Sequence, residues 1–476
     1  MKTLQHYIDG RFVAPVTGAG RFSVINPATE APVAEILMGS SADIDAAVAA
    51  AVRAFPTFAA LPLSERIAML ERLLAVYERR YADMVEAITT EMGAPHDLSK
   101  RSQAAAGRGH IQEAINAARS LDWEVRTRGA AVMREPVGVC GLITPWNWPL
   151  NQIGAKVAPA LAAGCTVVLK PSEQAPLSAQ LFAEFMDEAR FPTGVFNMVH
   201  GTGPVVGHAL AGHPDVDMMS FTGSTRAGIS VAKTAADTVK RVAQELGGKS
   251  PNLVFADADL EAAVKRGVLH CFNNSGQSCN APTRMLVEDS VYDRAVEIAV
   301  ATGAAVEVGD PSKPGKHLGP VASRMQFEKI GRCIEQGIAE GARLVLGGPG
   351  RPPGLDVGYY VRPTIFADVD NRMSIARDEI FGPVLSMMRF RTLDEAIAIA
   401  NDTPYGLAAY VQTQDLDKAR RVARRLRAGS VHLNGAAQDY DAPFGGFKQS
   451  GNGREFGSYG LGEFLEFKSI NGYYAA

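Results

Sequence analysis

Apolar residues recur along the chain at two different spacings, and the change between them separates a helical region from alternating ones. From Ser41 to Gly93 the spacing is helical, and Ser64 is the expected N-cap of one helix. The apolar residues of that helix repeat at intervals of three and four on one face: Ile67, Leu70, Leu74 and Tyr77. Gly93 and Pro95 are expected to end the helical region, because neither residue favours continuing a helix.

After Val137, short β-like runs alternate with helical stretches. The β-like runs cover residues 138–144, 165–170, 195–200 and 217–222. The helical patterns cover residues 151–162, 176–190, 204–211 and 224–236. A second series starts with β-like Asn252–Phe255, helical Asp259–Asn273 and β-like Arg284–Glu288, and it continues to about residue 435. Such alternation predicts parallel sheets with crossover helices.

Two extended segments stand outside these series. One is centred on Trp123–Arg126, and the other is the aromatic-rich run Leu465–Tyr474. Unattached ribbons of this kind are candidates for pairing between subunits, because an unpaired strand edge is a template for another strand. We therefore predict an α/β chain with two doubly wound parallel-sheet domains and a small β ribbon for oligomerisation.

Length and composition indicate a folded protein with more than one domain. The 476 residues exceed what a single core supports, and the apolar fraction of 46% and charged fraction of 21% are typical of globular proteins. With 48 Lys and Arg against 51 Asp and Glu, the net charge of −3 gives no general attraction to nucleic acid or to a membrane surface. We expect neither as a partner.

Targeting signals and cysteine usage favour the cytoplasm. The N-terminal residues lack the apolar core of a secretory signal, and no run approaches the roughly 20 apolar residues of a membrane span. The 5 cysteines form no CxxC pair and are odd in number, which fits a reducing compartment better than a disulfide framework. We expect a soluble cytoplasmic protein with no metal site.

Cys279 and Glu245 are a candidate nucleophile and a candidate general base. A free cysteine has a pKa of roughly 8.5, so a neighbouring base must help to remove its proton before the sulfur attacks a carbonyl carbon. Cys279 follows Gly276 just beyond a helical pattern, where a loop can present it to a cleft. Taken singly, Cys279 can equally be an inert buried cysteine, and Glu245 a surface carboxylate in a glycine-flanked turn.

Asn147 lies in the segment PWNWPL, between a predicted strand and a predicted helix. Its amide can therefore point into a crevice at the carboxyl end of the strand and donate a hydrogen bond to an oxyanion. The alternative is that Asn147 only caps the following helix.

Three segments suggest a dinucleotide site. Gly201–Gly207 and Phe221–Gly228 each follow a strand and open a helix, although neither has the full glycine fingerprint and Ser224 also reads as a simple helix cap. Lys170 and Glu173 end a strand, where they can hold an adenosine ribose. An acid there disfavours a 2′-phosphate, which favours NAD over NADP.

Taken together, the motifs resemble those of the aldehyde dehydrogenase superfamily, in the expected order and over nearly the whole chain. They are PWNWPL from Pro145, ELGGKSP from Glu245, GQSC from Gly276, EIFGPV from Glu379 and PFGGFKQSGNGRE from Pro443. The resemblance implies a cofactor domain of residues 1–118 and 138–248, a catalytic domain of residues 249–448, and an oligomerisation segment of residues 119–137 and 465–476.

The resemblance also implies roles for individual residues. Cys279 is the nucleophile, Glu245 the general base, and Asn147 with the backbone N–H of Cys279 the oxyanion site. Lys156 and Asn434 match positions near the catalytic centre, where Lys156 assists proton transfer. The expected cofactor-binding residues are Thr144, Pro145, Trp146, Asn147, Lys170, Ser172, Glu173, Gly203, Gly207, Phe221, Gly223, Ser224, Leu246, Gly247, Glu379 and Phe381. The expected substrate-pocket residues are Trp148, Gln152, Asn273, Ser278, Asn280, Asn434 and Phe444.

The implied reaction is the NAD-dependent oxidation of an aldehyde to a carboxylic acid, through a hemithioacetal and a thioester on Cys279. Arg226 stands where many family members have Glu, which leaves NADP open as an alternative cofactor. The polar residues expected in the pocket favour a polar or small-to-medium aldehyde. A homo-oligomer, either a dimer or a tetramer, is expected.

Three other functions remain open on the sequence alone. The first is an acylating enzyme that passes the acyl group to coenzyme A. The second is a cofactor-independent thiol esterase that uses the same cysteine. The third is a non-catalytic binding protein on an enzyme scaffold, against which the set of Cys279, Glu245, Asn147 and Lys170 argues.

Overall fold

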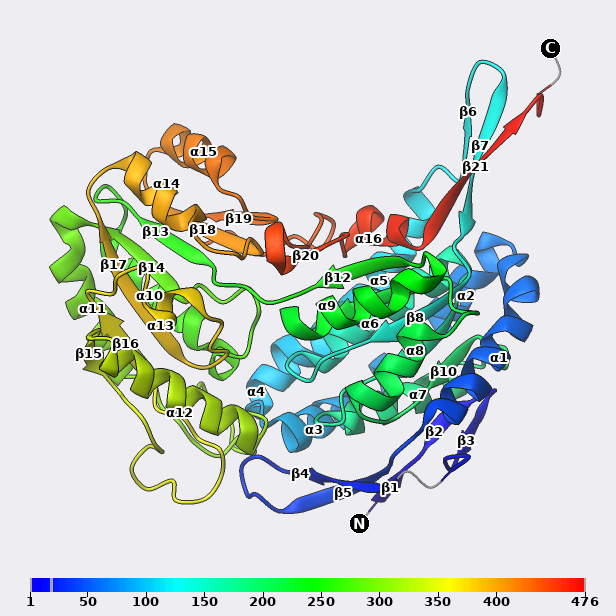
Figure 1. Cartoon of the computed structure of the whole chain (residues 1–476), viewed down its shortest axis with the longest axis horizontal. Helices are drawn as coiled ribbons and strands as arrows, with labels where there is room; N and C mark the ends of the chain where they lie inside the picture. Colours follow the sequence, from blue (N-terminus) through cyan, green and yellow to red (C-terminus); the bar gives the residue numbers. More distant parts are fainter. Residues whose placement is uncertain (1, 18–19, 475–476) are drawn as a thin grey trace.

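Two large sheets, each covered by helices, lie side by side along the longest axis of the molecule (Figure 1). The computed structural model describes residues 2–17 and 20–474 of the chain. A narrow ribbon projects from the body near the C-terminus, away from the N-terminal strands (Figure 1).

The first sheet has eight strands in the order β20-β12-β11-β8-β9-β10-β2-β3. Its central strands are parallel: β8 (Val139–Ile143), β9 (Thr166–Lys170), β10 (Phe196–Met198), β11 (Met218–Thr222) and β12 (Arg241–Glu245). They confirm the four β-like runs predicted after Val137. Because the chain order reverses between β8 and β11, a crevice is expected at the carboxyl ends of these two strands.

Helices cover both faces of the first sheet, and each layer has its own apolar core. One layer contains α2 (Leu63–Arg79), α3 (Tyr81–Met92), α5 (Ala104–Ser120), α6 (Pro149–Ala163) and α7 (Pro176–Glu188). The other contains α1 (Ser41–Ala59), α8 (His208–Gly212) and α9 (Thr225–Ala235). Strands β8 to β11 are buried on both sides, which explains their continuous apolar runs.

The helix termini confirm one prediction and correct another. Gly93 ends α3 with φ +75°, a left-handed conformation that glycine adopts without strain. Ser64 is not a cap, because α2 already begins at Leu63, directly after Pro62. Pro62 occupies the cap position instead: its ring fixes φ at −52° while its ψ of 144° is extended, so helical geometry starts at the next residue, Leu63.

The second sheet has seven strands in the order β15-β16-β17-β14-β13-β18-β19. The strands are β13 (Pro251–Val254), β14 (Arg284–Glu288), β15 (Arg343–Leu346), β16 (Thr364–Ala367), β17 (Val384–Phe390), β18 (Ala408–Gln412) and β19 (Ser430–Leu433). The helices are α10 (Leu260–Phe272), α11 (Tyr292–Ala304), α12 (Arg324–Ala339), α13 (Ser374–Arg377), α14 (Leu393–Asn401) and α15 (Leu416–Arg425). All pairings except β15 with β16 are parallel, as predicted.

One short strand joins the two halves of the molecule. After β19 the chain crosses back, and β20 (Gly451–Asn452) pairs with β12 so that Gly451 lies opposite Glu245. The segment that carries PFGGFKQSGNGRE is thereby placed against the end of β12. The helix α16 (Gly457–Glu463) follows it.

The N-terminal strands were not predicted from the sequence. A small sheet contains β1 (Lys2–Leu4), β4 (Arg21–Ile25) and β5 (Pro32–Leu37), and an antiparallel pair, β2 (His6–Ile8) and β3 (Arg11–Val13), extends the first sheet. Several of these strands are only three residues long, too short for an alternating pattern to be recognised.

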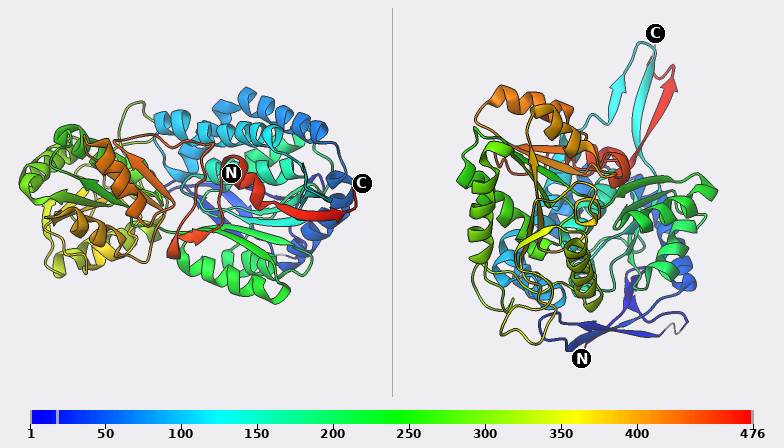
Figure 2. Two further views of the ribbon diagram at one scale, coloured as in Figure 1. Left: turned by 90° about the horizontal axis from the view of Figure 1, so that it is seen from above. Right: turned by 60° about the vertical axis from the view of Figure 1, so that its left-hand side comes forward.

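The two extended segments predicted as ribbons pair with each other. The three-stranded ribbon contains β6 (Glu124–Arg126), β7 (Ala130–Pro136) and β21 (Leu465–Asn471). It stands clear of the body in the right-hand view of Figure 2 as well as in Figure 1. Both β6 and β21 are edge strands, so pairing between subunits stays a prediction. Residues 475 and 476 of the predicted oligomerisation segment lie outside the described residues.

Within residues 2–17 and 20–474, no helix combines the length and the apolar character that crossing a lipid bilayer requires.

Candidate active site

A cavity of about 190 Å³ opens at the carboxyl ends of β8 and β11, where the chain order of the first sheet reverses. It is lined by Pro145, Trp146, Asn147, Gln152, Thr222, Gly223, Ser224, Leu246, Gly247, Cys279, Gln326, Lys329, Glu379 and Phe381. Most of these residues come from the motifs singled out in the sequence. The fold therefore brings together segments that are far apart along the chain.

Cys279 is partly exposed at this cavity, in the loop after a 3₁₀ turn over Asn273–Gly276. Gly276 has φ +73°, and a Cβ there would overlap the backbone of Gly382. The loop can therefore reach this position only with glycine at 276. Burial raises the pKa of the Cys279 thiol, and the Glu379 and Glu245 carboxylates raise it further. The thiol is thus protonated at neutral pH until a base removes its proton.

Asn147 is held rigidly beside the cysteine loop. Its backbone carbonyl accepts hydrogen bonds from Gln103 Nε2 at 3.1 Å and from Asn274 Nδ2 at 3.0 Å. Its side-chain Nδ2 donates to the carbonyl of Gln277 at 3.0 Å. An amide nitrogen carries two hydrogens, so one remains for an oxyanion that forms at a carbonyl bound to Cys279.

Glu245 ends β12 and is buried, and within the described residues neither of its carboxyl oxygens has a hydrogen-bond partner. Burial raises its pKa well above the ordinary value, and the nearby Glu455 carboxylate raises it further, whereas Lys156 and Arg454 oppose the shift. Room for the carboxyl group comes from Gly445, since a Cβ there would lie 2.8 Å from Glu245 Oε1. Glu245 is therefore a buried acid poised to exchange a proton.

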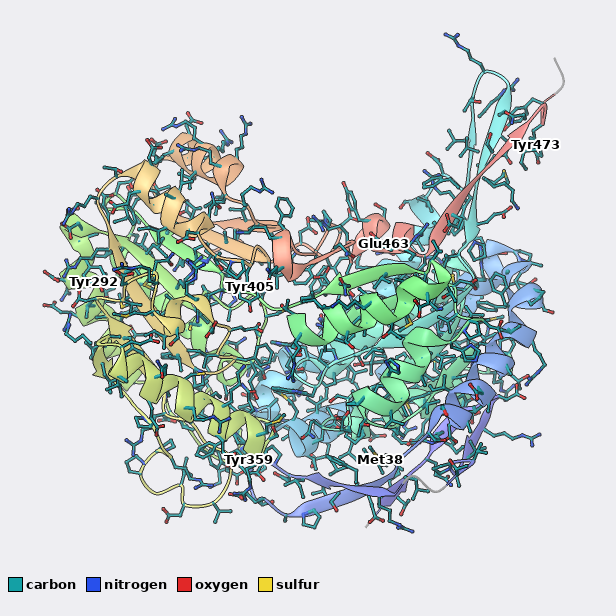
Figure 3. All side chains as sticks on the ribbon, viewed as in Figure 1. Met38, Tyr292, Tyr359, Tyr405, Glu463 and Tyr473 are labelled. Atoms are coloured by element: carbon teal, nitrogen blue, oxygen red, sulfur yellow. The ribbon has the colours of Figure 1, made fainter. Side chains whose placement is uncertain are left out.

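Lys156 and Glu455 form a buried ion pair next to Glu245. Lys156 Nζ, on α6, donates to a carboxyl oxygen of Glu455 and to Ser220 Oγ at 3.1 Å. Glu455 is placed by the segment that contains β20. That segment is fixed at one end by Arg454 N, which donates to Glu463 Oε1 at 2.9 Å. Towards its other end, Lys448 Nζ donates to Thr403 O at 2.6 Å, two positions before Tyr405, which Figure 3 labels together with Glu463.

The strand ends of the first sheet present polar groups that suit an adenosine ribose. Lys170 Nζ lies 2.9 Å from Glu173 Oε2, and Ser172 Oγ accepts a hydrogen bond from Gln174 N at 3.2 Å. Thr144 follows β8, and its buried hydroxyl has no hydrogen-bond partner within the described residues. The charged pair and the adjacent hydroxyls can bind ribose hydroxyl groups.

Two glycine-rich segments leave backbone accessible at the starts of helices. No atom lies within 4 Å of a Cβ built at Gly203, and only a methyl group of Ile143, at 3.6 Å, approaches one at Gly207. Ser224 caps α9 by accepting a hydrogen bond from Ala227 N at 3.3 Å, which confirms its reading as a cap. The ring of Phe221 packs under Gly223. An open helix N-terminus of this kind suits a pyrophosphate.

Glu379 and Phe381 approach the cavity from the second sheet. Gly248 N donates to Glu379 Oε1 at 3.1 Å, and a Cβ at Gly247 would collide with the same carboxylate. Phe381 lies edge-on to Trp146, with ring centroids 5.5 Å apart. These contacts join the two halves of the molecule across the cavity.

The residues expected in a substrate pocket divide into two groups. Trp148 Nε1 donates to Ser278 Oγ at 2.8 Å, Gln152 lines the cavity of Cys279, and Phe444 belongs to an apolar cluster on which Cys279 packs. Asn273 and Asn280 instead line a separate cavity of about 670 Å³ between α10 and β18.

The local backbone explains the separation. Asn274 and Ser275 have φ +54° and +55°, and this turn directs the chain away from Asn273 before Cys279 is reached. Asn434, in the turn after β19, is exposed, and its Oδ1 accepts a hydrogen bond from Thr413 N at 3.0 Å. The structure therefore does not bring Asn273, Asn280 or Asn434 to the cavity of Cys279.

Comparison with known proteins gives the same picture. The family model described as "Aldehyde dehydrogenase family" matches residues 13–470. The chain belongs to the aldehyde dehydrogenase family. It is 55% identical over 470 residues, 98% of either chain, to 3-succinoylsemialdehyde-pyridine dehydrogenase from a Pseudomonas species.

Two solved structures of aldehyde dehydrogenases are also close. The enzyme from Bartonella henselae has a TM-score of 0.97 at 50% identity, with 99% of this chain and 100% of that one covered. A cysteine-to-alanine variant of aldehyde dehydrogenase C from Pseudomonas syringae, in complex with NAD+ and octanal, has a TM-score of 0.98 at 51% identity, with 99% and 97% covered. The predicted fold class and family resemblance are confirmed.

Several residues at the site were not singled out from the sequence. Lys329 and Gln326, on α12, line the cavity and hold the loop of Glu379 and Phe381: Lys329 Nζ donates to Glu379 O at 2.9 Å, and Gln326 Nε2 to Phe381 O at 2.8 Å. Glu455 was quoted within its motif but given no role. The sequence pattern of α12 does not distinguish Gln326 and Lys329 from the other polar residues of this helix.

Proposed function

We propose that this chain oxidises an aldehyde to its carboxylic acid with NAD as the hydride acceptor. The observation that carries the proposal is the placement of Cys279 at a cavity between the two sheets, with the amide of Asn147 and the buried carboxyl group of Glu245 close to it. A nucleophile, an oxyanion donor and a base are the three groups that this chemistry needs.

NAD fits the residues on the cofactor side. Lys170 and Glu173 suit the adenosine ribose, the N-terminus of α9 at Ser224 suits the pyrophosphate, and Glu379 with Phe381 suits the nicotinamide riboside. The Pseudomonas syringae relative is solved with NAD+, which supports the same choice. Glu173 disfavours the 2′-phosphate of NADP, whereas the exposed Arg226 at the start of α9 favours it, so NADP is the alternative.

The chain's own residues account for the covalent steps. Glu245, once deprotonated, takes the proton of the Cys279 thiol, and the sulfur bonds to the aldehyde carbon. Asn147 Nδ2 and the backbone N–H of Cys279 hold the resulting oxyanion. NAD, when bound, supplies the hydride acceptor that converts this hemithioacetal to a thioester. Glu245 then takes a proton from water, whose oxygen attacks the thioester carbon, and Cys279 leaves as the thiol.

Lys156 and Glu455 extend the path for protons released at Glu245. The pair is buried and lies close enough to influence the pKa of Glu245. A proton on Glu245 can therefore pass towards Glu455 during turnover instead of directly to solvent.

We also propose the domain boundaries given above, with residues 119–137 and 465–476 as the segment that joins subunits into a dimer or tetramer. The ribbon supports this proposal because its edge strands β6 and β21 stand away from the body. The sequence favoured a polar or small-to-medium aldehyde as substrate. Trp148, Gln152 and Ser278, which lie near Cys279, support that substrate class. The names of two relatives mention a pyridine semialdehyde and octanal, and these compounds differ too much to indicate a single substrate for this chain.

The test is a panel of aldehydes assayed for NADH formation with NAD and with NADP, with the product identified by mass spectrometry. The free acid is expected, with a higher kcat/KM with NAD. An acyl-coenzyme A product, formed only when coenzyme A is added, would show that the enzyme transfers the acyl group to coenzyme A instead of hydrolysing the thioester. Ester cleavage without oxidation of any aldehyde would contradict the proposal and show that the protein is a thiol esterase.

A further inference from the structure

We propose that the substrate side of Cys279 selects aldehydes in which an aromatic ring lies a few bonds from the carbonyl group, and that Tyr440 and His110 determine this preference. The inference rests on the proposed aldehyde oxidation and names the substrate class of that site.

Four rings form a continuous aromatic wall, consisting of His110, Tyr440, Phe444 and Phe456. Phe444 and Phe456 are stacked, with centroids 5.0 Å apart and planes 25° from parallel. His110 lies 4.5 Å from Phe456, and edge-on to Tyr440 at 5.1 Å. Tyr440 completes the set at 5.4 Å from Phe456. All these separations lie in the range at which aromatic rings attract one another by shape and quadrupole.

The aromatic wall reaches the nucleophile on the side away from the cofactor residues. Cys279 packs against a cluster of Ala155, Leu407, Phe444 and Phe456. Its other neighbours line the cavity that contains Trp146, Ser224 and Glu379. If NAD occupies that cavity, the aldehyde must approach the sulfur from the side of the aromatic wall. Ala155 has the smallest side chain of this cluster.

Exposure separates Tyr440 from the other three rings. Tyr440 is 38% exposed, whereas Phe444, Phe456 and His110 are 8%, 7% and 3% exposed. Tyr440 is therefore the ring of the aromatic wall that faces solvent, and Phe444 and Phe456 are the rings that pack against Cys279. A flat substrate that enters beside Tyr440 would meet an aromatic surface on its way to the sulfur.

The backbone at Phe456 is strained in a way that keeps its ring in place. Phe456 has φ +74°, a left-handed conformation that is costly for any residue with a side chain. It follows Glu455, the partner of Lys156, and it stacks on Phe444. Such strain persists only where the surroundings impose it, and here the ion pair on one side and the stack on the other do so. The ring position is thus set by the same segment that serves Glu245.

His110 adds one polar feature to the aromatic wall. Its Nε2 lies 2.7 Å from Asn151 Oδ1, an acceptor, so the proton is on Nε2 and Nδ1 keeps a lone pair. Burial lowers the pKa of His110, which keeps the ring neutral at pH 7. A neutral imidazole can lie against another aromatic ring without a charge to hydrate. An alkyl chain would gain contact area with these rings but none of their directional attraction.

The test compares 3-phenylpropanal with nonanal, which have the same number of carbon atoms. With NAD present, wild-type protein is expected to show a kcat/KM about tenfold higher for 3-phenylpropanal. Tyr440→Leu is expected to lower that value about two- to tenfold, mainly through KM, and to change the value for nonanal by less than about twofold. Tyr459→Leu, which removes a 57% exposed ring of α16 outside the aromatic wall, is the matched control and should change neither.

A binding measurement keeps the two proposals separable. Titration calorimetry with the two acids, 3-phenylpropanoate and nonanoate, should show tighter binding of the aromatic acid to wild-type protein and loss of that difference in Tyr440→Leu. Equal or better turnover and binding of the alkyl compounds by wild-type protein would overturn the inference. So would an equal loss for both aldehydes in Tyr440→Leu. Failure of both aldehydes to produce NADH, with aromatic binding retained, would count against the proposed oxidation and leave the aromatic preference standing.

Discussion

Lys156 and Glu455, which are 299 positions apart in the sequence, form a buried ion pair beside the carboxyl group of Glu245. The negative charge of Glu455 is the largest influence, after burial, that raises the pKa of Glu245. The protonation of the proposed base therefore depends on a residue from a distant part of the chain.

The first prediction follows from this arrangement. Glu455→Gln removes the negative charge at similar volume, so the pKa of Glu245 should fall. Activity requires deprotonated Glu245 and rises with pH through that pKa, so the rising limb of kcat against pH should move to lower pH. Loss of one partner from a buried pair should also destabilise the protein by about 3–5 kcal/mol.

The control is Glu466→Gln, which removes an exposed carboxylate of the ribbon strand β21 that pairs with Arg241 of β12. Its pH profile should match that of the wild type. If the rising limb of kcat against pH stays in place or moves to higher pH in Glu455→Gln, Glu455 does not raise the pKa of Glu245.

The second prediction concerns Cys279→Ala. Without the sulfur no hemithioacetal can form, so NADH production should fall by at least about a thousandfold, while NAD binding measured by fluorescence quenching persists. Cys333→Ala is the matched control, because this half-buried cysteine on α12 does not line the cavity of Cys279. Retained turnover in Cys279→Ala would remove the sulfur from the mechanism.

The third prediction separates oxidation from hydrolysis. Glu245→Gln can take a proton neither from the Cys279 thiol nor from water. The thiol proton can still leave to solvent, so the acyl group should form more slowly than in the wild type and then remain on Cys279. Intact-protein mass spectrometry should then show the mass of the acyl adduct, and NADH should appear as a burst close to the enzyme concentration. A variant that turns over steadily, with no adduct, would show that another group is the base.

The fourth prediction concerns acid stability. Burial is the largest cause that lowers the pKa of His200, to about 3, with the charges of His6 and Lys170 adding to it. Unfolded histidine has a pKa of roughly 6.5, so the unfolded state binds the proton first as pH falls. This contribution to stability is complete above about pH 6.5 and is lost progressively below it, towards pH 3, by up to about 1.4 kcal/mol per pH unit.

The measurement is the free energy of unfolding by urea as a function of pH. His200→Gln should flatten the slope between about pH 6 and pH 4, although it also loses some stability at neutral pH. His6 is also buried, with a lowered pKa, and Asp43 lies 3.8 Å from its Nε2, so protonation of His6 is partly compensated. If the slope of the unfolding free energy against pH is unchanged in His200→Gln, groups other than His200 cause the loss of stability in acid.

Sequence reasoning located the parts of the site that depend on local order along the chain. Lys170 and Glu173 could be paired because they are three residues apart at the end of a strand. Cys279 and Asn147 could be assigned because each follows an element whose type is clear from its pattern. The family resemblance then supplied the roles, which the residues alone had left open.

The rest could not be predicted because it depends on tertiary contacts and on single backbone angles. Glu455 reaches Lys156 across 299 positions in the sequence, through a short strand of two residues. Asn273 lines a cavity other than the one that contains Cys279, because Asn274 and Ser275 turn the chain with positive φ angles, which the sequence pattern did not predict.

The last prediction tests the close approach of Glu379 to the backbone. A Cβ at Gly247 would overlap the Glu379 carboxylate, which accepts a hydrogen bond from Gly248 N at 3.1 Å. Gly247→Ala should therefore push Glu379 out of position and weaken NAD binding by about tenfold or more, because a contact to the nicotinamide ribose is lost. Gly331→Ala is the matched control, since no atom lies within 4 Å of its Cβ and alanine favours the helix α12. Isothermal titration with NAD measures both variants, and equal affinity in Gly247→Ala and wild type would show that Glu379 does not contact the cofactor.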